Sequence, residues 1–206
     1  RALCDRNGPL GADGVLFISE STTCDVKMRM LNPDGTEPET CANGLRCAAR
    51  YYFDVSKKKN GLIETSGGSA FAEKVDIKEW PGVYCVRVKV GPLSVDPKDF
   101  PSVELSTPGF HCFESLAPDS PHFVISAPNP HILEFVDQID EEVMAEKGNR
   151  IEAGVPDFPN RTNLSHIREI NNDSIFVRTF ERGAGFTLSC GSAMASSAYA
   201  FYSKAR

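Results

Sequence analysis

Runs of alternating hydrophobic and polar residues predict β-strands in the first part of the chain. Residues 25–31 alternate and predict a strand with one polar face, while the apolar run 14–19 is typical of a buried strand. Asn32-Pro33-Asp34-Gly35 is a strong turn signal. Small residues, two arginines and three aromatic residues predict a helix over 43–54. Further strands are expected at 61–65, 69–76 and 82–90, with a turn at Pro81-Gly82.

A second series of elements follows. Strands are expected at 122–127, up to Pro128-Asn129-Pro130, and at 131–136, and a short helix over 139–148 that ends at Gly148-Asn149. Two strands at 162–170 and 173–180 predict a hairpin around Asn171-Asn172-Asp173. Small residues predict a final helix over 191–203.

The two halves repeat one plan, in which strands lead to a polar loop, a cysteine and a helix that opens on small residues. The cysteines are Cys41 and Cys190. We therefore predict an α+β fold of two pseudo-symmetric domains, residues 1–90 and 91–206, with an active site in the cleft between them. The chain opens and stops in helical patterns, so we expect the first domain to be truncated at its start and the second at its end.

Composition excludes several classes of function. The net charge is −6 and no basic stripe occurs, which argues against nucleic-acid binding. No apolar run reaches transmembrane length and no secretion signal opens the chain, so we expect a cytoplasmic protein without a membrane partner. The seven cysteines are odd in number, and no pair is separated by only two residues. This spacing argues against zinc and redox motifs, so no metal is expected.

Two of these cysteines have the position that proton transfer at a carbon centre requires. Inversion removes a proton from one face and delivers one to the other, which suits two groups on opposite walls of a cleft. A thiol just before a helix is favoured as thiolate, and the helix N–H groups at Ala42-Asn43 and Gly191-Ser192 suit a substrate carboxylate. The alternative is a structural role, because free cysteines are usually small buried residues. That alternative is expected for Cys4, Cys24, Cys47, Cys85 and Cys112.

Six segments in order along most of the chain carry a family resemblance. They are Gly11–Leu16, Met28–Gly35, Cys41–Cys47, Asn129–His131, Phe158–Asn163 and Glu181–Ser192. With these segments the chain resembles diaminopimelate epimerase.

The resemblance implies interconversion of LL- and meso-2,6-diaminopimelate, a step of lysine and peptidoglycan precursor biosynthesis, without pyridoxal phosphate, another cofactor or a metal. It implies a homodimer with a small amino-acid substrate and makes Cys41 and Cys190 the paired acid and base. It also implies which backbone groups bind the substrate carboxylate and which side chains contact the substrate. The backbone groups belong to Ala42, Asn43, Gly191 and Ser192, and the side chains are Asn32, Asn129, Asn163, Glu181 and Arg182.

The chain departs from the family pattern at Ala42 and Ala193, where the family usually has glycine. Two alternatives therefore stay open: a racemase of another amino acid, such as histidine, and an inactive fragment that only binds amino acids. Physical chemistry leaves other roles for some assigned residues. The asparagines suit turns, and the pair of Glu181 and Arg182 suits an exposed ion pair. A neutral substrate side chain would not need both charges, so the pair favours diaminopimelate.

Overall fold

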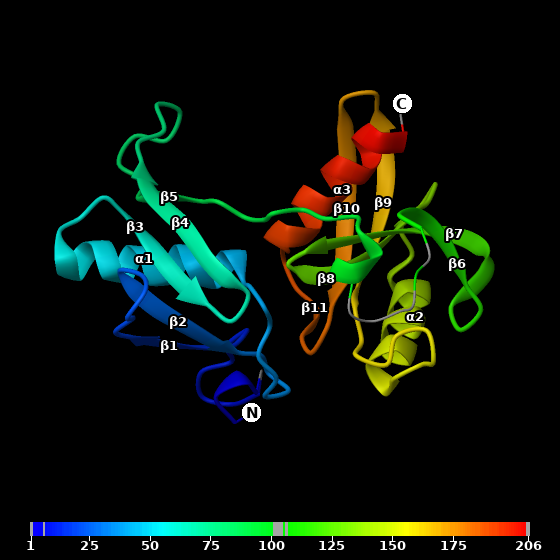
Figure 1. The fold of residues 1–206 in the computed structure, drawn as a ribbon, viewed down its shortest axis with the longest axis horizontal. Helices are drawn as coiled ribbons and strands as arrows, with labels where there is room; N and C mark the ends of the chain where they lie inside the picture. Colours follow the sequence, from blue (N-terminus) through cyan, green and yellow to red (C-terminus); the bar gives the residue numbers. More distant parts are fainter. Residues whose placement is uncertain (1, 6, 101–104, 106, 205–206) are drawn as a thin grey trace. The chain divides into compact units, whose positions relative to one another are not determined.

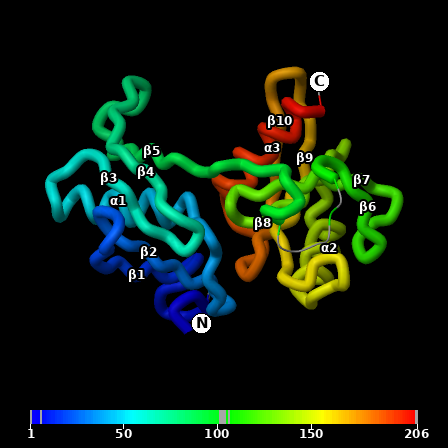
Figure 2. Tube along the Cα trace, viewed as in Figure 1, coloured from blue at the N-terminus to red at the C-terminus, as the bar shows by residue number. Residues whose placement is uncertain are grey.

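The computed structural model describes residues 2–5, 7–100, 105 and 107–204. The chain divides into two compact units, Arg1–Val90 and Gly91–Arg206, each with its own sheet (Figures 1 and 2). Sheets with few helices confirm the predicted α+β class. Among the helices described, none is both long and apolar enough to cross a membrane.

The first unit is a five-stranded sheet with one long helix. Its strand order is β1-β2-β3-β4-β5, and only the pair β2 and β3 is parallel. Helix α1 lies between these two strands in the sequence, as a parallel connection requires. The bounds are η1 Ala2–Cys4, β1 Val15–Ser19, β2 Val26–Leu31, α1 Ala42–Ser56, β3 Asn60–Thr65, β4 Gly68–Val75 and β5 Cys85–Val88.

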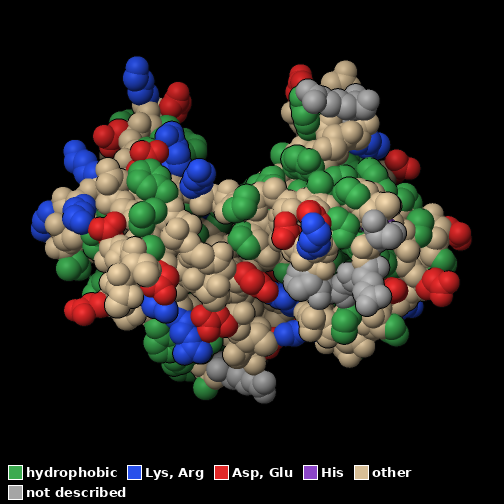
Figure 3. All heavy atoms as spheres, viewed as in Figure 1, with side chains coloured by type: hydrophobic (Ala, Val, Ile, Leu, Met, Phe, Trp, Pro, Cys, Tyr) green, Lys and Arg blue, Asp and Glu red, His purple; other side chains and the backbone are tan. Residues whose placement is uncertain are grey.

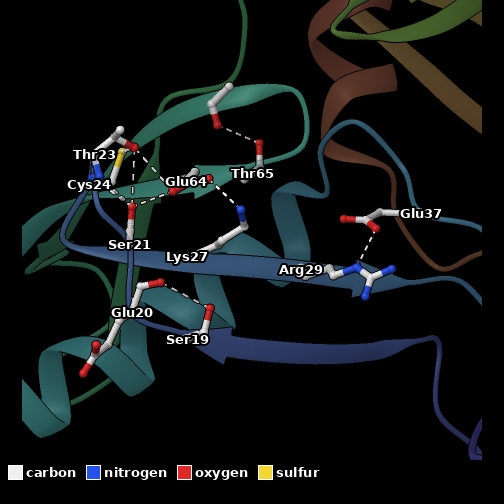
Figure 4. Close-up of polar contacts among 11 residues, drawn as sticks. Ser19, Glu20, Ser21, Thr23, Cys24, Lys27, Arg29, Glu37, Glu64 and Thr65 are labelled. Atoms are coloured by element: carbon white, nitrogen blue, oxygen red, sulfur yellow. Dashed lines mark hydrogen bonds and ion pairs between the residues drawn. The ribbon is translucent and has the colours of Figure 1, made fainter.

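Alternation along β2 decides which side of this sheet is apolar. Val26 and Met28 are buried in a core with residues of α1, whereas the side chain of Lys27 is exposed and pairs with Glu64 at 2.7 Å. Figure 4 shows this polar surface, where Arg29 also pairs with Glu37 at 2.7 Å. The strand with one polar face is therefore confirmed. The prediction of a buried strand at 14–19 was wrong, because β1 is an edge strand and half of Phe17 is exposed.

The second unit is a six-stranded sheet in the order β11-β10-β9-β8-β7-β6. Only β8 and β9 are parallel, and α2 connects them. The bounds are η2 Pro97–Asp99, β6 Gly109–Phe113, β7 Ala117–Ala127, β8 Asn129–Phe135, α2 Glu141–Ala153, β9 Asn163–Asn171, β10 Ser174–Glu181, β11 Gly185–Phe186 and α3 Gly191–Lys204.

Both faces of this second sheet are covered, since neighbouring residues of a strand point to opposite faces. Ile132 of β8 belongs to a core with Met144 and Ile151 of α2. The next residue, Leu133, belongs to a second core with Ala200 of α3. The two helices therefore cover opposite faces. Burial on both faces explains why β8 is nearly all buried.

Several predicted boundaries differ from the structure. Strand β7 begins at Ala117 rather than at residue 122, and β8 begins at Asn129, directly after a bend at Pro128. The short strands β6 and β11 were not predicted, and β5 is shorter than the expected strand 82–90. Strand β11 is only two residues long, too short for alternation to reveal it.

The prediction that this helix ends at Gly148 was wrong. Helix α2 continues to Ala153, and Gly154, in the left-handed conformation, is its C-cap residue. Gly148 lies inside the helix and is buried. A Cβ atom there would lie 2.5 Å from the ring of Phe180 on β10. The glycine therefore permits close packing of the helix on the sheet rather than ending the helix.

A row of polar side chains crosses three strands on the face covered by α2. Glu134 is paired across the sheet with His122 and His166, and all three are buried. Its carboxylate lies 3.4 and 3.1 Å from their Nε2 atoms and accepts hydrogen bonds from Lys147 and Ser120. Burial raises the pKa of Glu134, but these four partners outweigh burial and hold the pKa below its usual range.

Two cysteines that were expected to be buried are exposed. Cys47 lies on the outer face of α1 and Cys112 lies on β6. Cys4 is buried as expected, and Cys24 and Cys85 are partly buried.

Charged groups of both signs are interspersed over the face of the molecule that Figure 3 shows.

Replacing Gly148 with alanine tests the close packing of α2. Alanine normally stabilises a helix interior by about 1 kcal/mol relative to glycine. Here we expect G148A to lower the free energy of unfolding by about 1–3 kcal/mol, because the new methyl group meets the Phe180 ring. Urea unfolding measures the change, and N149A, at an exposed position of the same helix, is the matched control. A G148A variant as stable as the wild type would contradict this packing.

Candidate active site

Cys41 is the N-cap residue of α1. Its backbone is extended, with φ −137° and ψ 104°, and its carbonyl accepts the helical hydrogen bond from Leu45. Its Sγ atom accepts the N–H of Gly44 at 3.3 Å. A Cβ atom at residue 44 would lie 3.0 Å from Leu16 Cδ2 and 3.4 Å from Cys41 Sγ. The sulfur therefore lies over exposed helix N–H groups, where an anion is stabilised.

Three other candidates of the first unit lie at the end of β2 or at the start of α1. Asn32 follows β2 and is buried in the predicted turn, in which its carbonyl accepts the N–H of Gly35 at 2.9 Å. Its Nδ2 atom donates to Thr36 Oγ1 at 3.3 Å. Ala42 is buried as the first residue of α1, whereas Asn43 is exposed and accepts from Arg46. The expected turn at residue 32 is confirmed.

Parallel strands bring the candidates of the second unit to one edge of the sheet. Asn129 and Asn163 are the first residues of β8 and β9, and His131 is paired with Asn163. Strand β10 runs antiparallel to β9 and pairs Phe180 with Leu164, so its last residue, Glu181, reaches the same edge.

Hydrogen bonds hold the backbone at this edge. The side chain of Asn163 donates to the carbonyl of Pro130 and accepts the N–H of Arg182, both at 2.9 Å. The carboxylate of Glu181 accepts the hydroxyl of Thr187. Asn163 thus joins the start of β8 to the turn after β10, and Thr187 orients Glu181.

Cys190 directly precedes α3, and its carbonyl accepts the N–H of Met194 at 3.0 Å. The residue is buried, and its Sγ atom lies 3.4 Å from the hydroxyl of Ser192. That hydroxyl lies 3.0 Å from Nε2 of His131, which is fully buried. A hydrogen-bonded chain therefore links the sulfur to the imidazole. Burial and the charge of Arg182 lower the pKa of His131 to about 3, so the ring is neutral.

The start of α3 favours the thiolate of Cys190, as expected, but burial of the sulfur outweighs this effect. Burial, and next the negative charge of Glu181, raise the pKa of this thiol to about 12. Hydrogen bonds from Ser192 and from the N–H of Ala193 lower the pKa, but they do not outweigh burial. Cys190 therefore carries its proton at neutral pH.

Comparison with known proteins identifies the family. The sequence model of the family described as "Diaminopimelate epimerase" matches residues 1–95 and 123–206. The chain belongs to the diaminopimelate epimerase family. It is 35% identical over 195 residues to the diaminopimelate epimerase of Clostridium acetobutylicum, with 94% of this chain covered, and 35% identical over 202 residues to that of Alkaliphilus metalliredigens, with 95% covered. The chain spans 58% and 69% of the lengths of these two relatives.

Solved structures share the fold of this epimerase family member. A hydroxyproline epimerase from Agrobacterium vitis, with bound trans-4-OH-L-proline, has a TM-score of 0.63 and 15% sequence identity, covering 98% of this chain and 63% of its own. A probable proline racemase from Agrobacterium radiobacter K84 has a TM-score of 0.63 and 16% identity, covering 96% and 64%. These likenesses confirm the predicted α+β fold with two domains.

Two residues of this edge were absent from the predicted site of the epimerase family member. His131 ends the family segment Asn129–His131 but was not assigned a role, and its lowered pKa makes the buried ring a weak base. Thr187 lies in the family segment Glu181–Ser192 but was not assigned a role, because its contact with Glu181 depends on the β10–β11 hairpin. Within the described residues, no three His, Cys, Asp or Glu side chains are grouped to hold a metal ion.

Alkylation of Cys190 tests the raised pKa. With a pKa of about 12, the thiolate fraction, and hence the rate with iodoacetamide, grows roughly tenfold per pH unit up to about pH 11. We expect E181Q to speed alkylation at pH 8, because it removes a negative charge that disfavours the thiolate. Mass spectrometry of the Cys190 peptide measures the rate. E169Q, at an exposed ion pair with Lys204, is the control, and a rate plateau near pH 9 would contradict the raised pKa.

Proposed function

We propose that this chain forms the catalytic part of an epimerase that interconverts LL- and meso-2,6-diaminopimelate, with Cys41 and Cys190 as the paired acid and base. One observation carries the proposal: each cysteine directly precedes the first residue of a helix, one in each unit. Membership of the family, with relatives named diaminopimelate epimerase, supports the substrate.

In the proposed reaction one sulfur is a thiolate and the other a thiol. The thiolate takes the α-proton, and the electron pair of the broken C–H bond moves into the substrate carboxylate. The thiol then delivers its proton to the opposite face of the carbon and becomes the thiolate. One proton leaves and one arrives, so the step is redox-neutral and the proposal requires no cofactor.

The raised pKa of Cys190 supports a division of roles at rest. A thiol with a pKa of about 12 keeps its proton, so we assign Cys190 as the first acid and Cys41 as the first base. The N–H that Gly44 donates to Cys41 Sγ supports negative charge on that sulfur. Reaction in the reverse direction exchanges the two roles. In that direction Ser192 stabilises the Cys190 thiolate through its contact with the sulfur.

The substrate is held at both of its ends in this proposal. Helix N–H groups bind the carboxylate at the reacting carbon, and they belong to Ala42, Asn43, Gly191 and Ser192. The distal end is itself an amino acid, so Glu181 accepts from its ammonium and Arg182 binds its carboxylate. The side chains of Asn32, Asn129 and Asn163 complete the contacts, and all three asparagines are buried.

The wider setting is part of the same proposal. The activity serves lysine and peptidoglycan precursor biosynthesis in the cytoplasm, and the enzyme acts as a homodimer. A racemase of a neutral amino acid is the second candidate, because the fold neighbours include a hydroxyproline epimerase and a probable proline racemase. The charged pair of Glu181 and Arg182 favours diaminopimelate over that candidate.

Substitution of single cysteines in the full-length protein tests the catalytic pair. We expect C41S and C190S each to abolish epimerisation, since a hydroxyl is too weak an acid and base at neutral pH. C47S is the matched control, because Cys47 is exposed on the same helix that Cys41 caps. Epimerisation is followed by chromatography of the stereoisomers, and equal losses in all three variants would mean that the pair is wrongly assigned.

Hydrogen exchange at the α-carbon tests the substrate. We incubate the full-length protein in D2O with LL-diaminopimelate and, separately, with histidine, and follow the α-proton by NMR. We expect exchange with diaminopimelate alone. Exchange with histidine alone would overturn the choice of substrate, and no exchange with either would overturn the enzymatic function.

A further inference from the structure

The turn that carries Arg182 is short and tightly bent. It joins β10 to β11, with Glu181 paired to Gly185 and the N–H of Ala184 donated to the carbonyl of Glu181 at 3.1 Å. Gly183 has a φ of 73°, in the left-handed region that favours glycine. A two-residue strand gives this turn little support of its own. Other residues must therefore fix the direction in which Arg182 leaves the turn.

Two side chains from outside the hairpin hold successive N–H groups of this turn. Asn163 accepts the N–H of Arg182 at 2.9 Å, and Glu152 accepts the N–H of Gly183 through Oε1 at 3.0 Å. The second carboxylate oxygen of Glu152 accepts from Arg161 at 2.7 Å. Glu152 lies in the last turn of α2, so it ties the helix that connects β8 and β9 to the turn after β10.

We propose that Glu152 is a positioning residue for substrate binding, which holds the Gly183 N–H and so presents Arg182 to the distal carboxylate. The inference rests on the proposed function. Arg161 keeps the Glu152 carboxylate in place. One carboxylate oxygen accepts from Arg161 and the other accepts the N–H of Gly183, so the carboxylate has little freedom to rotate. A side chain outside the candidate site thereby holds the peptide group that directly follows the binding residue Arg182.

The ion pair of Glu152 with Arg161 lies at the surface, where each side chain is 25% exposed, so solvent screens it and its contribution to the free energy of unfolding is smaller than that of a fully buried pair. A hydrogen bond from an N–H to a charged acceptor is shorter and stronger than one to a neutral acceptor. We therefore expect its loss to loosen the turn and weaken substrate binding, while the unit stays folded.

Amide hydrogen exchange tests the contact independently of any activity. In the full-length protein we expect E152A to raise the exchange rate of the Gly183 amide at least tenfold, because the amide loses its acceptor. E146A is the matched control, because Glu146 is an exposed glutamate of the same helix that pairs only with Arg150 among the described residues. E152Q keeps an acceptor oxygen, so its rate should stay within about threefold of the wild type. A Gly183 rate unchanged in E152A would overturn the proposal.

Steady-state kinetics then test the effect on binding. We expect E152A to raise KM for LL-diaminopimelate about tenfold with kcat within about twofold, since Arg182 contacts a part of the substrate that does not react. E152Q should recover most of the loss, and E146A should match the wild type. The melting temperature of E152A should stay within about 3 °C of the wild type.

The two measurements separate this inference from the proposed function. A wild-type protein without turnover would overturn the function and with it the role in substrate binding. Wild-type turnover with an unchanged KM in E152A would overturn the positioning role alone. A fall of kcat in E152A that is accompanied by a fall of the melting temperature by more than about 3 °C would show that Glu152 acts through stability, and it would overturn the proposal as well.

Discussion

The parallel pairing of β8 with β9 is the constraint on which the candidate site of the second unit depends. Parallel strands begin at the same edge, so Asn129 and His131 of β8 meet Asn163 of β9 there, although Asn163 is distant from both in sequence. The pairing also requires a crossover, which α2 provides. Gly148 lets that helix lie close to Phe180, and the end of the helix delivers Glu152 to the turn after β10. Packing and site are therefore parts of one arrangement.

Cys190 is subject to two opposed physical effects. A helix N-terminus stabilises negative charge, but burial removes the water that would solvate a thiolate, and the neighbouring Glu181 repels it. Burial and the charge of Glu181 together outweigh the effect of the helix, and the pKa of the thiol rises to about 12. A protonated sulfur bonded through Ser192 to a neutral His131 is suited to donate a proton rather than to accept one. Cys41, the cap of α1, is less buried and accepts an N–H.

Local patterns predicted local features well. Alternation along 25–31 identified β2 and its polar face, and the signal at residues 32–35 identified a turn that the structure contains. Small residues after Cys41 and Cys190 identified both helix starts. Family segments named the candidate residues, but their substrate contacts remain predictions. The same reasoning failed for Gly148 and for the edge strand β1, since neither packing against Phe180 nor position in a sheet is written in a local pattern.

The sequence by itself determined the α+β class, most of the strands and helices, the positions of two cysteines before helices, and the family. Elements and helix starts depend on residues that are near one another in the chain, and the family depends on the order of short segments along it. Only the tertiary structure decided that Cys47 is exposed, that Cys190 is a buried thiol beside Glu181, and that Glu152 holds the turn of Arg182. Burial, charge and hydrogen bonding at these residues come from segments distant in sequence, which meet only when the sheet pairs and α2 crosses it.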